Sequence, residues 1–197
     1  MSDSPDNDPV IISVAAYSEE PVAYEKKYST HLLDRPGRFA SLISPKSRIL
    51  DVGCGPGRDI QIFAEAGHTP IGIDLNPSFI QMARRHGEVI AGDIRDIGSI
   101  FTPLSFDGVW AQASLVHLKK AEVEKLLSDL RDLLKPNGHI YACVRATGET
   151  GWLDESDGRR WYTTWPDDSF EEAMTSAGFQ IIDVTRGPYV EVWAIKV

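Results

Sequence analysis

The feature that most constrains this chain is a glycine-rich turn that directly follows a short apolar run. Residues 49–58 read I-L-D-V-G-C-G-P-G-R, with glycines at positions 53, 55 and 57. Glycine lacks the Cβ atom that would hold a ligand away, and it adopts positive φ angles at little cost. An apolar strand, this turn and an amphipathic segment that opens at Arg58 predict the first strand–turn–helix unit of a nucleotide-type site, with exposed amides at the helix start.

The spacing of the glycines distinguishes between nucleotide ligands. A dinucleotide fingerprint, G-x-G-x-x-G, needs its third glycine at the position that Arg58 occupies. The G-x-G-x-G turn, with Asp51 just before it, resembles motif I of the class I S-adenosylmethionine-dependent methyltransferases. The resemblance implies that Asp51, Gly53, Gly55 and Gly57 surround the methionine part of S-adenosylmethionine. The alternative is a turn that joins a core strand to a helix and binds nothing.

Carboxylates follow the next two predicted strands. Asp74 ends the run 69–74, at about the interval from Asp51 at which an acidic side chain meets ribose hydroxyls in doubly wound folds. Asp74 is alternatively a helix cap, a role for which Asn76 is also available. We place Leu75 beside it in the cofactor site. After the strand 88–91, the resemblance implies that Asp93 accepts from the adenine amino group and that the next residue, Ile94, contacts the ring; the alternative is a surface loop.

The fourth predicted strand, 106–111, is followed by the segment 112–118, where ligands gather in such sheets. We assign Gln112 to the cofactor. His117 is the candidate general base, because imidazole titrates near neutrality; the alternative is a histidine that shapes or packs the site. Asp107 starts the strand, away from this edge, and is expected to be structural.

Aromatic residues flank the predicted core fold on both sides. Tyr17, Tyr24 and Tyr28 recur at intervals that place them along one side of a helix. Core packing is one interpretation, whereas the resemblance implies that an N-terminal helical cap, residues 10–44, covers the substrate pocket. The segment 146–165 is predicted to be a lid or substrate loop, although its aromatics alternatively anchor a loop. The candidate acceptor-binding residues of the chain are Tyr17, Tyr24, Tyr28, His117, Arg145, Trp152, Tyr162 and Trp165.

The rest of the chain completes an α/β pattern. An amphipathic helix over 121–134 precedes L-K-P-N-G and a strand over 140–144, and a last helix over 168–177 precedes two strands joined by the turn 186–189. We predict a doubly wound, Rossmann-like, seven-stranded sheet, mostly parallel, that ends in an antiparallel C-terminal hairpin. Residues 10–197 form a single methyltransferase domain in this interpretation, and residues 1–9 form a disordered tail.

Composition limits the classes of partner. The formal net charge of −9 argues against nucleic acid as the main partner, because phosphate binding usually needs a basic face. Cys54 and Cys143 lack CxxC spacing and are expected to be reduced. The start of the chain lacks the basic and apolar parts of a signal peptide, and no apolar run is long enough to span a bilayer. We therefore expect a cytoplasmic protein, a monomer or homodimer, without membrane contact or a bound metal.

Together these features predict an S-adenosylmethionine-dependent methyltransferase. The implied reaction is an in-line SN2 transfer of a methyl group to oxygen, nitrogen or carbon of a small molecule, with S-adenosylhomocysteine as the product. Positioning and the exclusion of water would supply most of the catalysis. Two alternatives remain: methylation of a macromolecule such as tRNA or a protein side chain, and cofactor binding without methyl transfer.

Overall fold

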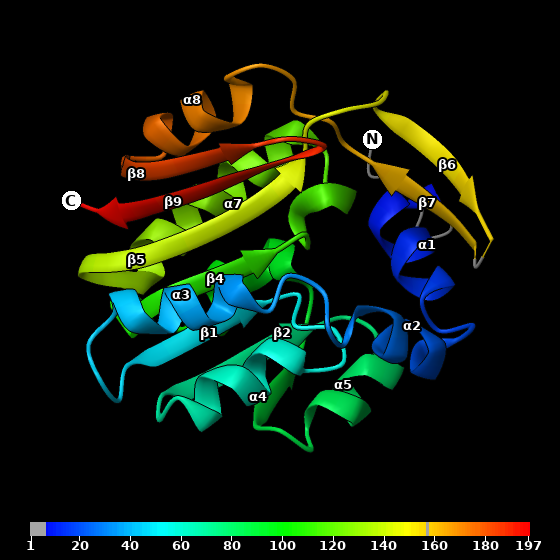
Figure 1. The fold of residues 1–197 in the computed structure, drawn as a ribbon. Coiled ribbons are helices and arrows are strands. Elements are labelled where there is room, and N and C mark those ends of the chain that lie inside the picture. Colours follow the sequence, from blue (N-terminus) through cyan, green and yellow to red (C-terminus); the bar gives the residue numbers. More distant parts are fainter. Residues whose placement is uncertain (1–6, 157) are drawn as a thin grey trace.

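The fold is a central sheet covered by helices (Figure 1). The computed structural model describes residues 7–156 and 158–197. Seven strands follow the order β3-β2-β1-β4-β5-β9-β8, in which the first five run parallel and β9 pairs antiparallel with both β5 and β8. This arrangement confirms the predicted sheet, including its C-terminal hairpin. The strands are β1 (Arg48–Val52), β2 (Thr69–Asp74), β3 (Glu88–Ala91), β4 (Phe106–Gln112), β5 (Leu134–Arg145), β8 (Phe179–Arg186) and β9 (Tyr189–Lys196).

The core lies on both faces of this sheet, because its inner strands are apolar on both sides. One cluster joins the sheet to α7, whose stripe of Val123, Leu126 and Leu130 is fully buried. The other joins it to α3 and α4 through aromatic rings that surround Trp110. The helices of the sheet layers are α3 (Asp34–Leu42), α4 (Arg58–Glu65), α5 (Pro77–Ala83), α6 (Ile97–Ile100), α7 (Lys120–Leu133) and α8 (Ser169–Ser176).

The N-terminal segment differs from the prediction that the three tyrosines lie along one side of a helix. Two helices form, α1 (Pro9–Ala16) and α2 (Pro21–Tyr28). The Asp8 side chain accepts from the Val10 amide at 2.9 Å and so caps α1. Pro9 is therefore the first residue of a helix and not part of a tail, whereas residues 1–6 lie outside the described residues. The tyrosines still meet across the break, with ring centroids 5.1 Å apart for Tyr17 and Tyr24.

The segment predicted as a lid loop is a β-hairpin, β6 (Gly151–Glu155) paired with β7 (Gly158–Tyr162). It lies beside α1, away from the main sheet (Figure 1). In β7, Arg160 and Tyr162 are buried while Arg159 and Trp161 face the other side. Arg160 is charged and yet buried, so the alternation of apolar and polar residues that usually predicts a strand is interrupted here. Within the described ranges, no helix has the length and apolar character needed to cross a bilayer.

Candidate cofactor and acceptor site

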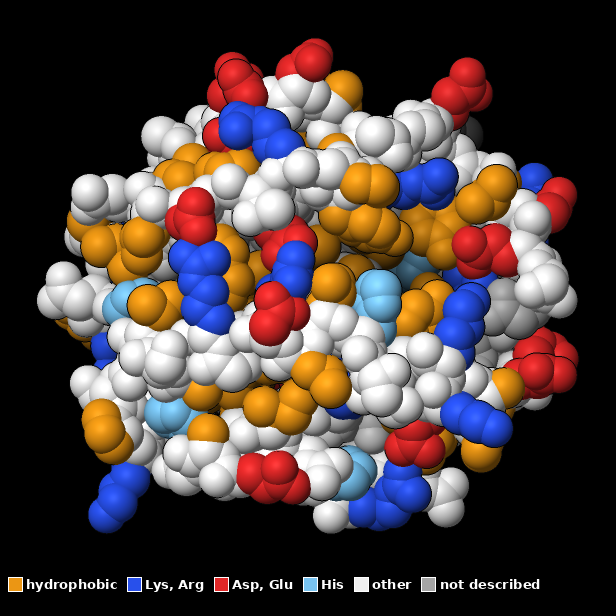
Figure 2. Space-filling model, in the orientation of Figure 1, with side chains coloured by type: hydrophobic (Ala, Val, Ile, Leu, Met, Phe, Trp, Pro, Cys, Tyr) orange, Lys and Arg blue, Asp and Glu red, His pale blue; other side chains and the backbone are white. Residues whose placement is uncertain are grey.

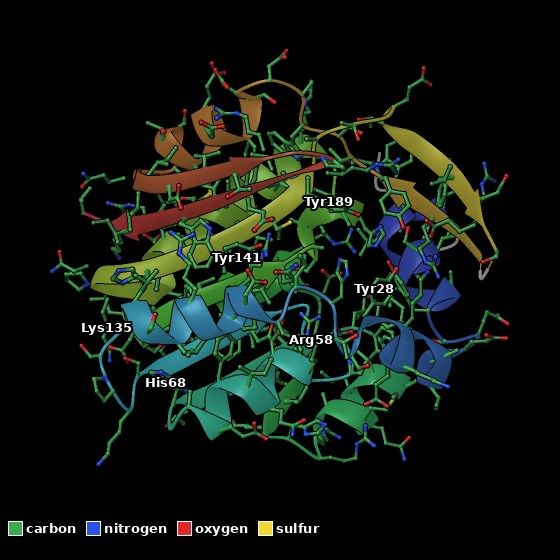
Figure 3. All side chains as sticks on the ribbon, in the orientation of Figure 1. Tyr28, Arg58, His68, Lys135, Tyr141 and Tyr189 are labelled. Carbon is green, nitrogen blue, oxygen red and sulfur yellow. The ribbon has the colours of Figure 1, made fainter. Side chains whose placement is uncertain are left out.

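Two neighbouring cavities that share six lining residues lie at the carboxyl ends of β1, β2 and β4. The larger has a volume of about 1100 Å³ and the smaller about 130 Å³, and the glycine turn, Tyr17, Tyr24 and Gln112 line both. Figure 2 shows hydrophobic side chains gathered around a hollow on this face, with charged side chains at its rim. Tyr28, Arg58 and Tyr189, which line the larger cavity, are labelled in Figure 3. Ligands collect at this edge of doubly wound sheets, as predicted for this chain.

The glycine turn forms a cradle, and each of its three glycines is required for a different physical reason. Their φ angles are +67°, +54° and +92° at Gly53, Gly55 and Gly57. A Cβ atom on Gly53 would lie 2.4 Å from the Ser114 side chain, and one on Gly57 would lie 2.7 Å from the Ala83 Cα atom. A Cβ atom on Gly55 would meet no heavy atom within 4 Å. Gly53 and Gly57 thus allow close packing, while Gly55 leaves open the space that a ligand needs.

Acceptor atoms without partners face this cradle. Asp51 is 3% exposed, and neither its Oδ2 atom nor the Oε1 atom of Gln112 has a hydrogen-bond partner among the described residues. Burial and then the neighbouring Asp59 raise the pKa of Asp51 well above its usual range. Buried acceptors that lack donors are costly, and an ammonium group supplies such donors. Both residues therefore fit the amino end of an amino-acid ligand.

Asp74 holds the glycine turn against β2. Its Oδ2 atom accepts from the Gly55 amide and its Oδ1 atom from the Asn76 amide, each at 2.8 Å. Asn76 itself caps α5 by accepting from the Ser78 amide at 2.9 Å, so Asp74 is not needed as that cap. Burial raises the pKa of Asp74, and the backbone donors oppose this shift. Each carboxylate oxygen keeps acceptor capacity for a hydroxyl, and Asp74 lines the smaller cavity beside Leu75.

Asp93 and Ile94 line the other end of the smaller cavity. The Asp93 carboxylate accepts from the Arg95 amide at 2.9 Å and forms an ion pair of 2.6 Å with the Arg95 guanidinium. Arg95 in turn pairs with Asp8 at the start of α1, at 2.8 Å. Asp93 is thus fixed in place rather than free in a surface loop, and Ile94 beside it is 8% exposed.

His117 lies in the short helix Leu115–His117 and does not present a free nitrogen. Its Nε2 atom is 2.9 Å from the Tyr17 hydroxyl, and its Nδ1 atom is 2.6 Å from the Trp161 carbonyl oxygen. Burial is the main cause that lowers the pKa of His117 to about 4, with a further contribution from Arg160. Both ring nitrogens of His117 are thus engaged within the protein, and its role as the direct base stays a prediction.

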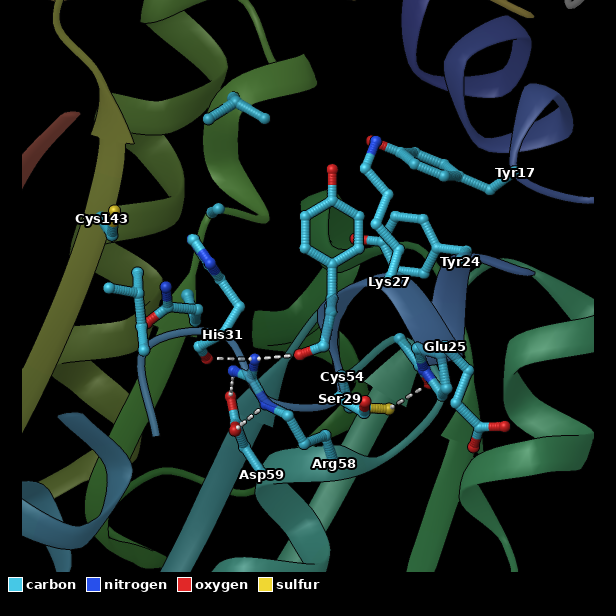
Figure 4. A pocket seen from close by; sticks show the side chains of 18 of the residues that line it. Tyr17, Tyr24, Glu25, Lys27, Ser29, His31, Cys54, Arg58, Asp59 and Cys143 are labelled. Atoms are coloured by element: carbon cyan, nitrogen blue, oxygen red, sulfur yellow. Dashed lines mark hydrogen bonds and ion pairs between the residues drawn. The ribbon is translucent and has the colours of Figure 1, made fainter. Parts of the chain in front are cut away.

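The predicted acceptor-binding aromatics divide into two groups. Tyr17, Tyr24, Tyr28 and Tyr162 line the larger cavity, and Figure 4 shows Tyr17 and Tyr24 side by side at one end of it. The structure does not bring the other three to either cavity. Trp165 is 1% exposed and packs on Phe170, Trp152 packs on Trp161, and Arg145 lies over the outer side of the Tyr162 ring; none of these three is among the residues that line either cavity.

Sequence reasoning missed the ion pair of Arg58 and Asp59. Arg58 donates to the carbonyl oxygens of Tyr28 and His31, at 3.0 and 2.8 Å, so the helix after the glycine turn holds the segment between α2 and α3 (Figure 4). Asp59 accepts from Arg58 at 2.7 Å and from the buried Trp110 indole at 2.8 Å. The sequence shows the charged pair directly after Gly57, but it does not show that Tyr28, His31 and Trp110 are its hydrogen-bond partners.

Charged and tyrosine residues of the C-terminal half complete the larger cavity. Glu155, Arg160, Tyr189 and Glu191 all line it. Glu191 accepts from Arg35 of α3 at 3.2 Å and so links the N-terminal helices to β9. No local pattern in the sequence places these four side chains at one cavity. Among the described residues, no group of three or more His, Cys, Asp or Glu side chains is arranged to hold a metal ion.

The strand order, the glycine turn after β1 and the carboxylates after β2 and β3 define a Rossmann-like methyltransferase. Residues 49–138 match a family described as a methyltransferase domain. The matched domain and the fold are consistent with the class I S-adenosylmethionine-dependent methyltransferases, for which S-adenosylmethionine is the cofactor.

Individual relatives differ in the acceptors that their names state. The chain is 26% identical over 168 residues to the ubiquinone biosynthesis O-methyltransferase of Brucella anthropi, covering 75% of this chain and 66% of that protein. It is 39% identical over 80 residues to the 18S rRNA (guanine-N(7))-methyltransferase bud23 of Schizosaccharomyces pombe, covering 39% of this chain and 30% of that protein. The chain therefore spans only part of these two curated relatives.

A solved structure covers the whole chain. The 1,6-didemethyltoxoflavin-N1-methyltransferase of Burkholderia thailandensis, with 1,6-didemethyltoxoflavin and S-adenosylhomocysteine bound, has a TM-score of 0.78 and 21% identity, covering 100% of this chain and 92% of that one. At this identity the likeness concerns the fold alone.

Proposed function

We propose that this protein transfers a methyl group from S-adenosylmethionine to a small-molecule acceptor. The observation that carries the proposal is the junction of the two cavities. A cradle that is open at Gly55 and faced by unpartnered acceptors at Asp51 and Gln112 adjoins a larger space lined by tyrosines. Cofactor and acceptor would therefore meet at the glycine turn.

The residues on the smaller cavity would hold the nucleoside end. Asp74 would accept from ribose hydroxyls, Asp93 from the adenine amino group, and Leu75 and Ile94 would contact the apolar faces. Asp51 and Gln112 would take the amino end. When bound, the cofactor would supply an electrophilic methyl carbon, and the electron pair of its bond to sulfur would stay on sulfur when the acceptor takes the methyl group. The tyrosines and the α1–α2 segment would exclude water and align the acceptor.

A small acceptor is favoured by how the larger cavity is covered. Tyr17, just after α1, and segments of α2, β7 and β9 contribute to its walls, and its lining mixes acidic with basic side chains. A polyanion usually needs a basic face, and the chain carries a net charge of −9. The structure of the Burkholderia protein holds 1,6-didemethyltoxoflavin beside S-adenosylhomocysteine. The yeast relative, by its name, acts on rRNA, so a macromolecular acceptor is the alternative outcome of the test.

The test is the formation of S-adenosylhomocysteine from S-adenosylmethionine with a panel of small phenols, ring N–H heterocycles, amines and carboxylates. We expect acceptor-dependent product with at least one small molecule. Product formed only with tRNA or a protein acceptor, with binding that weakens as salt rises, would replace the small-molecule proposal. Cofactor binding without product for any acceptor would instead favour a binding protein without methyl transfer.

A further inference from the structure

The junction between the two cavities contains few groups able to take a proton. Six residues line both cavities: Tyr17, Tyr24, Gly53, Gly55, Gln112 and Ala113. A methyl group that passes from one cavity to the other must pass this junction. Among these six residues only the two tyrosines carry a hydroxyl, and the Gln112 amide has no group that titrates near neutral pH. The two tyrosine hydroxyls are therefore the candidates for handling a proton of the acceptor.

The contacts of the two hydroxyls differ. The Tyr17 hydroxyl is hydrogen-bonded to His117 Nε2 at 2.9 Å, whereas the Tyr24 ring packs against those of Tyr17, Tyr28 and Phe79 and lies in the field of Asp74. A carbonyl oxygen only accepts, so the 2.6 Å contact with the Trp161 oxygen assigns the ring proton of His117 to Nδ1. His117 Nε2 is then the acceptor and Tyr17 is the donor. The remaining lone pairs of the Tyr17 oxygen can accept a further hydrogen bond.

We propose that Tyr17 is the catalytic residue that receives the acceptor's O–H or N–H proton, and that His117 acts through Tyr17 as its positioning and proton-accepting partner. The proposal rests on the proposed methyl transfer. As the acceptor's heteroatom forms its bond to carbon, its proton moves to the Tyr17 oxygen, and the Tyr17 proton moves to His117 Nε2. The imidazolium keeps its Nδ1 proton on the Trp161 carbonyl, and it returns the extra proton through Tyr17 to water after the transfer.

The charge balance favours this step in a buried site. His117 is 7% exposed, and its pKa, lowered to about 4, keeps the imidazole neutral and able to accept. Creating a cation in such a place costs free energy. Here the imidazolium replaces the positive charge that the methyl donor gives up in the same step. The net charge of the site is therefore the same before and after the transfer.

The β6–β7 hairpin fixes both members of the pair. The Trp161 amide donates to Ser13 of α1 at 2.8 Å, while its carbonyl accepts from His117. The Thr163 amide donates to the Val116 carbonyl at 2.7 Å, next to His117. One short strand segment thus holds the helix before Tyr17 and the turn that carries His117. Tight positioning of this kind is what an efficient proton transfer requires.

Other charged groups face the pair. The Arg160 guanidinium lies 4.1 Å from the centre of the Tyr17 ring and forms an ion pair with Glu155. Glu155 also accepts from the Tyr162 hydroxyl at 3.0 Å, and the Tyr162 ring is 4.9 Å from that of His117. The cation of Arg160 opposes a proton on His117 and the anion of Glu155 favours it. The opposite charges of Arg160 and Glu155 balance beside the pair, which suits a neutral acceptor with a weakly acidic O–H or N–H.

The first experiment needs no acceptor. In protein with ¹⁵N-labelled histidine, assigned with His117→Gln, NMR should show His117 with its proton on Nδ1 and a neutral ring down to about pH 5. Tyr17→Phe should shift the Nε2 resonance of His117. Tyr141→Phe is the matched control, since it also loses a buried tyrosine hydrogen bond, 3.0 Å to Glu191, and should leave His117 unchanged. A proton on Nε2, or no response to Tyr17→Phe, overturns the proposed pair.

The second experiment follows proton transfer with two coloured probes, 4-nitrophenol for an O–H and 4-nitroimidazole for a ring N–H, added to the protein with S-adenosylmethionine. We expect at least one bound probe to ionise at least tenfold more readily in the wild type than in Tyr17→Phe. Calorimetry in two buffers of different ionisation enthalpy should show that His117→Gln releases the proton to solvent, whereas the wild type retains it.

The outcomes separate this proposal from the proposed function. Equal ionisation in the wild type and Tyr17→Phe, or loss of the effect with Tyr24→Phe instead, refutes Tyr17 as the proton acceptor. Failure of both probes to bind the cofactor complex refutes the acceptor class. If S-adenosylmethionine itself does not bind, the proposed function fails, and the NMR result still decides the Tyr17–His117 pair.

Discussion

Replacing Asp59 with alanine tests the ion pair that joins the glycine turn to the N-terminal helices. The Asp59 side chain is 8% exposed and faces an Arg58 side chain that is 22% exposed. Its removal leaves the Trp110 indole N–H without its acceptor, in a residue that is 0% exposed. A buried donor without a partner costs about 1–3 kcal/mol.

The loss of the Arg58 pairing adds a smaller amount. Arg58 is partly exposed and keeps its bonds to the Tyr28 and His31 carbonyls, so we take about 1 kcal/mol for it, between exposed and buried ion pairs. Together the free energy of unfolding should fall by about 3 kcal/mol. For a chain of this length each kcal/mol lowers Tm by about 2–4 °C, which gives a decrease of about 6–12 °C.

The assay is urea unfolding followed by tryptophan fluorescence, with calorimetric Tm as a second measurement. Asp59→Asn can still accept from the indole through its amide oxygen, and it should cost only about 1–2 kcal/mol. Asp154→Ala is the control, because its contact with Arg159 joins side chains that are 87% and 61% exposed and should change stability by less than about 0.5 kcal/mol. A loss below about 1 kcal/mol for Asp59→Ala would refute the reasoning.

Two further predictions concern the glycine turn and the buried histidine. Gly57→Ala should destabilise the protein by about 1–3 kcal/mol in denaturant titration, because the new Cβ would lie 2.7 Å from Ala83 at a φ of +92°; Gly55→Ala should keep most of the stability and instead weaken cofactor binding, and the reverse pattern would contradict the assigned roles. The pKa of His117 falls from 6.5 to about 4 on folding, so the unfolded chain binds the extra proton first as the pH falls. The contribution of neutral His117 to the free energy of unfolding is therefore fully present above pH 6.5, and about 3 kcal/mol of it is lost as the pH falls toward 4. Unfolding measured across pH should show a smaller loss in His117→Gln, and equal slopes in the two proteins would exclude this contribution.

The sheet was predictable because its signals are local. The apolar run before Gly53, the carboxylates that end the second and third strands and the L-K-P-N-G turn each report on a few adjacent residues. The glycine at position 57 could be predicted as necessary, but its reason, contact with Ala83 of α5, depends on a residue far along the chain. Likewise Asp74 was assigned from its interval, while its hold on the Gly55 amide required the folded turn.

The acceptor side was harder to predict because its contacts are long-range. Trp165 has an aromatic side chain like Tyr162, three positions away, yet one is packed on Phe170 and the other lines the cavity. The hairpin was hidden because Arg160 occupies a buried position that a strand pattern assigns to an apolar residue. The hydrogen bond between Tyr17 and His117 joins residues that are 100 positions apart in the sequence. No spacing rule connects them.

The most direct test of the central claim is isothermal titration calorimetry with S-adenosylmethionine on the wild type, Asp74→Ala and the exposed control Asp154→Ala, each first checked for an unchanged unfolding transition. If the cradle beside Asp74 holds the cofactor, the wild type and Asp154→Ala bind with equal Kd, and Asp74→Ala binds at least tenfold more weakly, a loss of about 1.4 kcal/mol or more. No binding by the wild type, or an unchanged Kd in Asp74→Ala, would contradict the account.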